Sequence, residues 1–437
     1  MKKIKVITGG KLIDPSAKIE KMADIYIENG EIKKVETSKL LTAKQLSEFD
    51  PEEILNAKGL IVAPGLIDMH VHLREPGFEG METIRSGSEA AAAGGFTSIC
   101  CMPNTSPAID NQETIKFIHT QAQNAPVRVY PVAAITKNRK GKELAEIGEL
   151  VSSGAVALSD DGSPVESAEM MRKAFDYSKM FPIPIIEHAE DLSLTGEGVM
   201  NEGFTSTKLG LKGIPSVSED TAVARDIMLA QYTGGRIHFA HVSTSGAVEL
   251  IRQAKRFRVE VTAEVTPHHI SLFDEMIADD YSTNLKMSPP LRTKADIRAL
   301  IKGLIDGTID CIASDHAPHS HQSKDVEFNL APNGIIGLET SLGVCVTYLV
   351  KEKHLSWTKL IRAMSTRPAE ILGLRAGTLK RGYPADITII DPEREWLVDP
   401  DKFKSKSRNS PYIGQTLTGK AVSTLVDGEI VYSDFAE

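Results

Sequence analysis

The sequence lacks any apolar run long enough to cross a membrane and any basic run long enough to bind nucleic acid. Its 437 residues carry a formal net charge of -9, which the short basic segment KSKSR at 404–408 does not offset. The N-terminal residues MKKIKVITGG lack the long apolar core of a signal peptide. We therefore expect a cytoplasmic protein that binds neither membrane nor nucleic acid.

Cysteine is also scarce, with four residues in the whole chain. Cys100 and Cys101 are adjacent within an apolar segment, whereas Cys311 and Cys345 stand alone. This spacing matches neither a disulfide framework nor a thiolate metal site. Reduced, buried thiols of a cytosolic protein are the simplest interpretation.

From about residue 61 onward, apolar strands alternate with helical patterns. The helical patterns lie at 87–95, 142–154, 218–234 and 293–307, and the predicted strands lie at 60–72, 96–104, 127–135, 155–162, 183–190, 236–243, 259–269 and 309–319. Eight such units in about 280 residues predict an α/β fold, a closed (β/α)8 TIM-like barrel. A doubly wound open sheet is the alternative, but no glycine-rich phosphate fingerprint follows the first strand.

Both ends of the chain have a different pattern, with short alternating strands and Asn-Gly or Asp-Gly turns. We expect residues 1–60 and 375–437 to meet in one small β-sandwich domain, and residues 61–374 to form the barrel. The segment STRPAEILGL, at 365–374, is predicted to be a helix that leads back to the small domain. The longest irregular segment of the barrel, 319–334, follows the last strand and is predicted to be a functional lid, with a disordered surface excursion as the alternative.

Polar residues recur where the predicted barrel strands end. On the first strand, His70 and His72 share one face because alternate side chains of a strand point the same way. Two such histidines alone could be hydrogen-bonded core residues. The ends of the other strands add further candidates, namely Asn104, Asp160, Asp161, His188, His241 and Asp315.

Barrel enzymes build their sites at the carboxyl ends of the strands, and imidazole with carboxylate ligands suits a catalytic zinc site. The remaining histidines have simpler interpretations. His119 and His354 are expected on the surface, and His238 in the packed interior. His268 and His269 lie near the expected mouth, but nothing in the sequence requires them as ligands.

Taken in order, GLIDMHVHLREPG, CMPNT, SDDGSPV, EHAED, HVST, NLKMSPPLR and SDHAPH resemble the long-chain bacterial dihydroorotases of the cyclic amidohydrolase superfamily. The resemblance covers essentially the whole chain. It implies a metal-dependent barrel that reversibly cyclises N-carbamoyl-L-aspartate to (S)-dihydroorotate, the third step of pyrimidine synthesis. It also implies a homodimer and a possible association with aspartate transcarbamoylase.

The resemblance assigns roles to individual positions. One or two zinc ions would be bound by His70, His72, Asp161, His188, His241 and Asp315, and Asp315 would also be catalytic. The substrate would be held by His72, Arg74, Asn104, Asn284, His319, Asn333 and Gly334.

Two positions depart from the pattern of relatives. The fourth strand ends in SDDG, without the carboxylated lysine that bridges two metals in many relatives, so Asp161 is expected to bridge and Asp160 is the second choice. Asn333 occupies a position where dihydroorotases commonly have an aromatic residue.

Arg74 is the residue that separates dihydroorotate from other cyclic amides. It lies two residues after His72, so a continued strand would place it on the ligand face, where a guanidinium can bind a carboxylate through two hydrogen bonds. A surface salt bridge with Glu75 or Glu79 is the alternative for this residue.

Two other functions are compatible with the same barrel. The protein could be a hydantoinase or allantoinase, or it could be an inactive partner of aspartate transcarbamoylase. Such a partner typically lacks metal ligands, whereas all six are present here.

Overall fold

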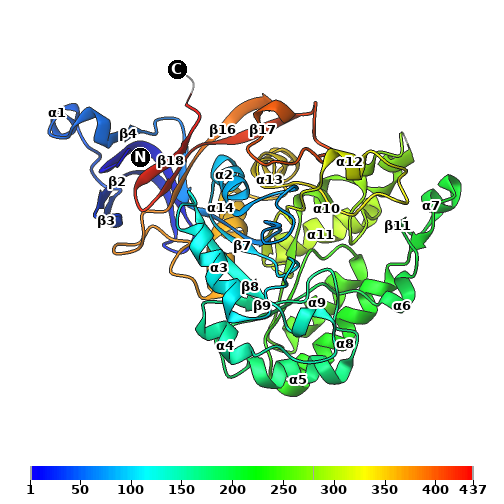
Figure 1. Ribbon diagram of the computed structural model, residues 1–437. Coiled ribbons are helices and arrows are strands. Elements are labelled where there is room, and N and C mark those ends of the chain that lie inside the picture. Colours follow the sequence, from blue (N-terminus) through cyan, green and yellow to red (C-terminus); the bar gives the residue numbers. More distant parts are fainter. Residues whose placement is uncertain (1, 279, 436–437) are drawn as a thin grey trace.

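Eight parallel strands form the central sheet of the protein, whose computed structural model describes residues 2–278 and 280–435 (Figure 1). The strands are neighbours in chain order, namely β6 (Leu66–Val71), β7 (Phe96–Cys101), β8 (Arg128–Ala133), β9 (Ala157–Leu158), β10 (Ile185–Glu187), β13 (Ile237–Phe239), β14 (Val261–Val265) and β15 (Cys311–Ile312). Val71 at the end of the first strand forms a parallel bridge with His316, just after the last. The predicted barrel with eight strands is confirmed.

Helices surround the strands and bury one side each against them. The larger ones are α2 (Ile84–Gly94), α3 (Gln112–Ala122), α4 (Ile147–Ser152), α5 (Ala168–Ser178), α8 (Val217–Thr233), α9 (Ser245–Arg256) and α11 (Lys294–Asp306). In α9 the buried residues Ala247, Val248, Ile251 and Ala254 follow the period of a helix with one apolar face. The Thr244 side chain accepts a hydrogen bond from the Ala247 amide and so caps the start of this helix.

Shorter elements lie between the barrel strands or after the last of them. They are α6 (Leu192–Thr195), β11 (Met200–Asn201), α7 (Phe204–Leu209), β12 (Gly213–Ile214), α10 (Pro267–Ser271), α12 (His321–Lys324), α13 (Ser341–Cys345), α14 (Trp357–Ile361) and α15 (Arg367–Leu372). The helix predicted at 142–154 is shorter than expected, since α4 begins only at Ile147. Leu144 instead forms a bridge with Thr136, which removes the first turns from the helix.

Both chain ends contribute to a second sheet, which is mixed and also has eight strands. Its strands are β1 (Val6–Asp14), β2 (Ile19–Glu28), β3 (Glu31–Glu36), β4 (Ile54–Asn56), β5 (Ile61–Pro64), β16 (Ile387–Leu397), β17 (Thr416–Val426) and β18 (Glu429–Ser433). The predicted hairpin turns are present, with positive φ at Asn29 and Gly30 and again at Asp427 and Gly428. The sheet encloses an apolar core to which the first and the last part of the chain both contribute, including Ile25 and Ile387.

The segment 60–72, predicted as one strand, is divided at Gly65 between the two sheets. β5 pairs with β1 and β16, whereas β6 begins the barrel. A Cβ atom at Gly65 would lie 2.1 Å from Thr97 Oγ1, so only glycine fits at this crossing. Residues 61–64 therefore belong to the terminal sheet rather than the barrel. Whether 1–60 with 375–437 and 61–374 form separate domains stays a prediction.

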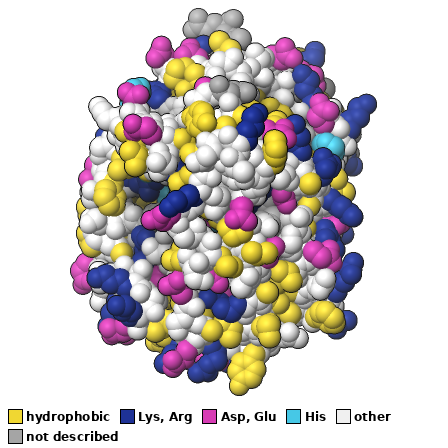
Figure 2. All heavy atoms as spheres, turned by 90° about the vertical axis from the view of Figure 1, so that its right-hand side faces the viewer, with side chains coloured by type: hydrophobic (Ala, Val, Ile, Leu, Met, Phe, Trp, Pro, Cys, Tyr) yellow, Lys and Arg dark blue, Asp and Glu magenta, His cyan; other side chains and the backbone are white. Residues whose placement is uncertain are grey.

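The surface of the protein mixes both signs of charge. On the face in Figure 2, lysine and arginine are interspersed with aspartate and glutamate, without a single-sign field. Among the described residues, no helix has both the length and the hydropathy of a membrane span. All four cysteines are buried and free, as the sequence predicted.

Candidate metal centre

Four histidines and two aspartates meet at the carboxyl end of the barrel. His70 lies in β6, His72 follows it, and the others come directly after strands β9, β10, β13 and β15, namely Asp161, His188, His241 and Asp315. Their exposed fractions range from 0% to 6%. The parallel strands carry these residues to one end of the sheet, which explains how segments far apart in sequence build one site.

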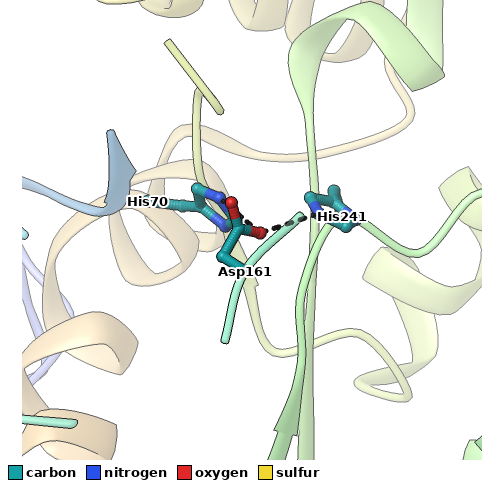
Figure 3. Close-up of side chains that lie close together, drawn as sticks. All are labelled: His70, Asp161 and His241. Atoms are coloured by element: carbon teal, nitrogen blue, oxygen red, sulfur yellow. Dashed lines mark ion pairs between the residues drawn. The ribbon is translucent and has the colours of Figure 1, made fainter. Parts of the chain in front are cut away.

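Asp161 occupies the middle of this group, between histidines from different strands (Figure 3). Its Oδ1 atom lies 3.3 Å from His70 Nε2 and 3.6 Å from His241 Nε2. The same oxygen lies 3.7 Å from His188 Nδ1, and Oδ2 lies 3.7 Å from His72 Nε2. One carboxylate thus faces all four histidines.

Asp160 does not join this group. Its carboxylate accepts hydrogen bonds from the amides of Ile135 and Thr136, at 2.8 and 3.1 Å, and from the Thr136 hydroxyl. These bonds fix the loop after β8. Of the two adjacent aspartates in SDDG, only Asp161 is therefore in a position to bind a metal.

Asp315 completes a second set of potential ligands with His70 and His72. Its Oδ1 atom lies 3.0 Å from His72 Nε2 and 3.5 Å from His70 Nε2. His70, Asp161 and His241 form one group with ligand atoms within 4.8 Å of one another, and His70, His72 and Asp315 form another. The two groups share His70, so the arrangement has ligands for one ion or for two neighbouring ions.

The nitrogen and oxygen atoms of this group are better suited to binding a cation than to hydrogen bonding with one another. His70 Nε2 and Asp161 Oδ1 are both buried, and neither has a hydrogen-bond partner within the described part of the chain. Buried polar atoms without partners are costly and rare in native proteins. Burial opposes the charge of Asp161, but the neighbouring His70 charge and the imidazoles of His188 and His241 hold the pKa of this carboxyl well below its usual value. A metal ion would satisfy both buried atoms.

Backbone conformation directs two of the side chains inward. His241 and Asp315 have φ values of 32° and 45°, in the left-handed region that residues other than glycine seldom adopt. Both lie just past the ends of their strands. Such conformations persist only where the surrounding structure enforces them, and they cluster at functional sites.

Two carboxylates outside the group, the buried Glu264 and the partly buried Glu190, hold the histidine rings in place. Glu264, in β14, lies with Oε1 3.1 Å from His70 Nδ1 and with Oε2 3.1 Å from His238 Nε2. Glu190 lies 3.2 Å from His188 Nε2 in the same way. Metal-bound histidines commonly donate their second N–H to a carboxylate, which fixes the ring and its tautomer.

Sequence reasoning missed Glu264 and Glu190 and assigned His238 to packing alone. His238 is fully buried, but it hydrogen bonds to the carboxylate that also holds His70. The sequence does contain a signal for Glu264, since a glutamate within the apolar strand VTAEV is seldom buried without a partner.

Replacing Glu264 with glutamine should weaken metal binding about 10–100-fold, because the amide cannot hold the His70 ring as a carboxylate does. The measurement is a chelator competition that yields the metal affinity of the purified variant. Glu260→Gln is the matched control, because Glu260 is exposed and directly precedes the same strand, β14. Equal affinities of the two variants would show that Glu264 does not support the ligand.

Four of the proposed substrate residues lie near the metal ligands or line a cavity. Asn104 Oδ1 lies 2.9 Å from His72 Nδ1. Arg74 Nε donates to the Pro318 carbonyl at 3.2 Å. Asn284 and His319 line a cavity of ≈ 430 Å³.

Arg74 reaches this region by a different route from the one expected. The strand does not continue through it, because Arg74 has a φ of 62° and the chain turns there. The alternative salt bridges with Glu75 and Glu79 are not formed among the described residues. Glu75 instead accepts a hydrogen bond from the Ile84 amide, and Glu79 accepts one from the Gly77 amide.

Among the described residues, the Arg74 guanidinium contacts the Pro318 carbonyl and His319, and it forms no salt bridge with a carboxylate. His319 Nε2 lies 2.8 Å from the Asn333 carbonyl and 3.4 Å from Arg74 Nη2. Burial lowers the pKa of His319 to about 3, so the ring is neutral and Nε2 can either donate or accept. The shorter contact requires Nε2–H to donate to the Asn333 carbonyl, so this nitrogen cannot also accept a hydrogen bond from Arg74. The Nη2 group of Arg74 therefore remains able to bind a carboxylate.

Asn333 and Gly334 are differently placed. The Asn333 side chain is exposed, and its carbonyl accepts from His319. The Gly334 amide donates to the Lys286 carbonyl at 2.9 Å, and the Gly334 carbonyl accepts from Asn409 at 3.1 Å. Both backbone groups of Gly334 are thus already bonded within the protein.

His268 is a further buried group beside the centre that sequence reasoning left without a role. It is 1% exposed, and its Nε2 atom has no hydrogen-bond partner. Burial lowers the pKa of His268 to about 4, against the opposing charge of Asp315. His269 differs, since its Nε2 lies 2.9 Å from the Pro289 carbonyl and its Nδ1 2.7 Å from Thr266 Oγ1.

Comparison with protein families and curated sequences gives consistent results. Residues 59–247 match a family described as dihydro-orotase-like, and residues 222–432 match the amidohydrolase family. A dihydroorotase of Geotalea daltonii is 53% identical over 427 residues, covering 98% of both chains. One from Pelobacter propionicus is 54% identical over 428 residues, covering 98% of this chain and 99% of the relative.

Solved structures share the fold with lower identity. An L-hydantoinase (dihydropyrimidinase) from Arthrobacter aurescens has a TM-score of 0.87 at 26% identity, covering 99% of this chain and 96% of that one. A dihydropyrimidinase from Brevibacillus agri has a TM-score of 0.84 at 23% identity, covering 98% and 95%. The second likeness concerns the fold alone. The barrel and the terminal sheet thus occur together in related folds.

Proposed function

Because the chain belongs to the dihydroorotase family and is a cyclic amide hydrolase, we propose that it interconverts (S)-dihydroorotate and N-carbamoyl-L-aspartate with one or two zinc ions. The observation that carries the zinc assignment is the buried group of four histidines and two aspartates, in which two donor atoms lack any partner. Nitrogen and oxygen donors without thiolate suit catalytic zinc.

Zinc, when bound, supplies hydroxide at neutral pH and polarises the ring carbonyl. The proposed ligands are His70, His72, Asp161, His188, His241 and Asp315. Glu264 and Glu190 keep His70 and His188 oriented through hydrogen bonds of 3.1 and 3.2 Å. The burial of the whole group excludes bulk water, which strengthens every electrostatic interaction within it.

Asp315 is proposed to move the proton. Burial opposes its charge, but His70 and His72 hold the pKa of Asp315 below its usual value, so the side chain is an ionised carboxylate at neutral pH. In hydrolysis it takes the proton from the attacking water and gives it to the ring nitrogen that leaves. In the biosynthetic direction the same carboxylate carries the proton the opposite way.

Arg74 is proposed to bind the substrate carboxylate, with Asn104, Asn284 and His319 as further polar contacts. Burial lowers the pKa of Arg74 to about 10, so the guanidinium stays charged at neutral pH. His72 would contact the substrate as well as the metal. Asn333 and Gly334 remain part of the proposal through the segment 319–334, in which Asn333 anchors His319.

The direct test compares dihydroorotate with hydantoin and allantoin as substrates of the purified protein, beside its metal content. We expect turnover of dihydroorotate that is lost on chelation and restored by zinc. A fully metallated, folded preparation that opens hydantoin but not dihydroorotate would overturn the assignment of substrate.

Replacing Arg74 with methionine should raise KM for dihydroorotate substantially, about tenfold or more, with a smaller fall in kcat. The carboxylate that Arg74 binds is charged in the ground state and in the transition state alike, so its loss mainly weakens binding. Steady-state kinetics measure both constants, with exposed Arg381→Met as the control. An unchanged KM would favour a hydantoinase-like site.

The proposal also covers the oligomeric state, the location and a partner of the enzyme. We expect a homodimer in the cytoplasm, and an association with aspartate transcarbamoylase is part of the same proposal. Sedimentation of the purified protein, alone and with the transcarbamoylase, measures both. A monomer in both samples would contradict this part without affecting the assignment of activity.

A further inference from the structure

Two buried lysines lie in the segments that border the cavity lined by Asn284 and His319. Lys286 and Lys324 are 5% and 6% exposed, and neither forms a salt bridge with any carboxylate among the described residues. Burying an ammonium group without a counter-charge is costly. Accordingly, burial lowers the pKa of Lys324 to about 7. An apolar side chain would fill the same space at lower cost, so the two ammonium groups require a specific explanation.

Hydrogen bonds from the two lysines join the segments 283–286 and 319–334. Lys324 Nζ donates to the Thr283 carbonyl at 3.0 Å and to the Pro332 carbonyl at 2.8 Å. In return, the Thr283 hydroxyl donates to the Lys324 carbonyl at 2.5 Å. The two segments are therefore linked in both directions at this point.

Lys286 makes the same kind of link further along. Its Nζ atom donates to the Asn329 carbonyl at 3.0 Å, and its own carbonyl accepts from the Gly334 amide at 2.9 Å. The ammonium also lies 5.7 Å from the centre of the Phe328 ring. Each segment thus supplies one lysine whose donors are used on backbone carbonyls.

The joined segments carry the proposed substrate contacts. Asn284 follows Thr283 directly, and it lines the cavity together with His319 and Lys324. His319 is itself held by the Asn333 carbonyl, next to Pro332. Any movement of 319–334 away from 283–286 would therefore separate Asn284 from His319.

We propose that Lys324 and Lys286 form a clasp that positions Asn284 and His319 for the substrate, with Lys324 as the principal positioning residue. The clasp is defined by the two ammonium groups and the carbonyls of Thr283, Pro332 and Asn329. This inference deepens the proposed function and rests on it, because Asn284 and His319 are assigned to the substrate there. It adds two residues that do not themselves bind the metal.

The test compares Lys324→Met, Lys286→Met and the double variant with Lys302→Met, an exposed lysine of α11. Hydrogen exchange of the free enzyme reports the clasp without any turnover. Loss of the Lys324 bonds should speed exchange of the Gly334 amide about tenfold or more, since two hydrogen bonds of ordinary strength are removed together. Lys302→Met should leave it unchanged.

Kinetics then report the link to the substrate. Lys324→Met should raise KM for dihydroorotate about tenfold, change kcat less than about threefold, and leave zinc content and the midpoint of global unfolding near those of the wild type. The effect of the double variant should be smaller than the sum of the two single effects, because both lysines act on one pair of segments.

Distinct results would overturn the clasp. Unchanged exchange at Gly334 together with unchanged KM would refute it. Faster exchange throughout the barrel, with equal losses in kcat and zinc, would show that Lys324 only supports overall stability. If the wild type itself failed to turn over dihydroorotate, the proposed function would fall, while the exchange result would still decide whether the lysines hold the two segments together.

Discussion

Replacing His70 and His72 together with alanine is expected to abolish zinc binding and to lower turnover at least about 10⁴-fold. His70 belongs to both groups of potential ligands, and His72 belongs to the group that contains Asp315. The double variant therefore removes a ligand from each. Without the metal, neither the hydroxide nor the polarised carbonyl is supplied, and the chemistry loses its main source of catalysis.

The fold should survive this change. His70 and His72 lie at the mouth of the barrel, whereas the apolar residues that hold the strands together, such as Met69 and Ile186, belong to a separate core cluster. The change also removes a buried imidazole nitrogen that lacks a partner in the absence of metal. Circular dichroism and the thermal midpoint should accordingly remain close to those of the wild type.

The matched control for the ligand pair is His119→Ala with His354→Ala, which removes two exposed histidines. Zinc content, measured per chain, and dihydroorotate turnover should both stay at wild-type values in this control. Retained zinc and turnover in the His70 and His72 variant would mean that the pair is structural. If that variant unfolds, the same measurements should be made on His241→Ala, which removes a single proposed ligand on the other side of Asp161.

Replacing Asp315 with asparagine should lower kcat about 10²–10⁴-fold, which corresponds to about 3–5 kcal/mol of lost transition-state stabilisation. Asparagine keeps the shape of the side chain but cannot accept and return a proton. KM should change much less, because the proton moves only during the reaction. This pattern is the reverse of that expected for Arg74→Met.

Zinc content must be measured beside the kinetics of the Asp315 variant. Asp315 Oδ1 lies close to both His72 and His70, so a role as ligand and a role as proton carrier predict the same loss of turnover. Full zinc content with depressed kcat supports the proton role, and zinc loss supports the ligand role. Asp401→Asn, at an exposed position, is the control. If Asp315→Asn keeps the wild-type kcat and full zinc content, Asp315 is neither a metal ligand nor the proton carrier.

The sequence by itself determined the barrel and the set of strand-end residues. Alternating apolar segments and helical patterns specified eight βα units, since strand and helix periods differ and can be distinguished locally. The hairpins at Asn29-Gly30 and Asp427-Gly428 were equally local, because a tight turn depends on residues that tolerate positive φ. Once the strands were assigned, parallel order brought His70, Asp161 and Asp315 to one end.

Other features depended on neighbours that are distant in sequence, and only the tertiary structure decided them. The Pro64-Gly65 pair is a local signal for a break in the strand, but only the approach of Thr97 shows that Gly65 separates the two sheets. Arg74 was expected on a continued strand, yet the chain turns there and the side chain contacts Pro318, in the segment after the last barrel strand.

The tertiary structure also decided how charges are balanced. Glu264 joins His70 to His238 across three strands, and Lys324 meets carbonyls from two segments. Such partners are selected by distance in the folded state, and a hydrogen bond extends only about 3 Å whatever the separation along the chain. Local patterns specify strands and helices, whereas the partner of a buried charge is specified only when the strands have been brought together.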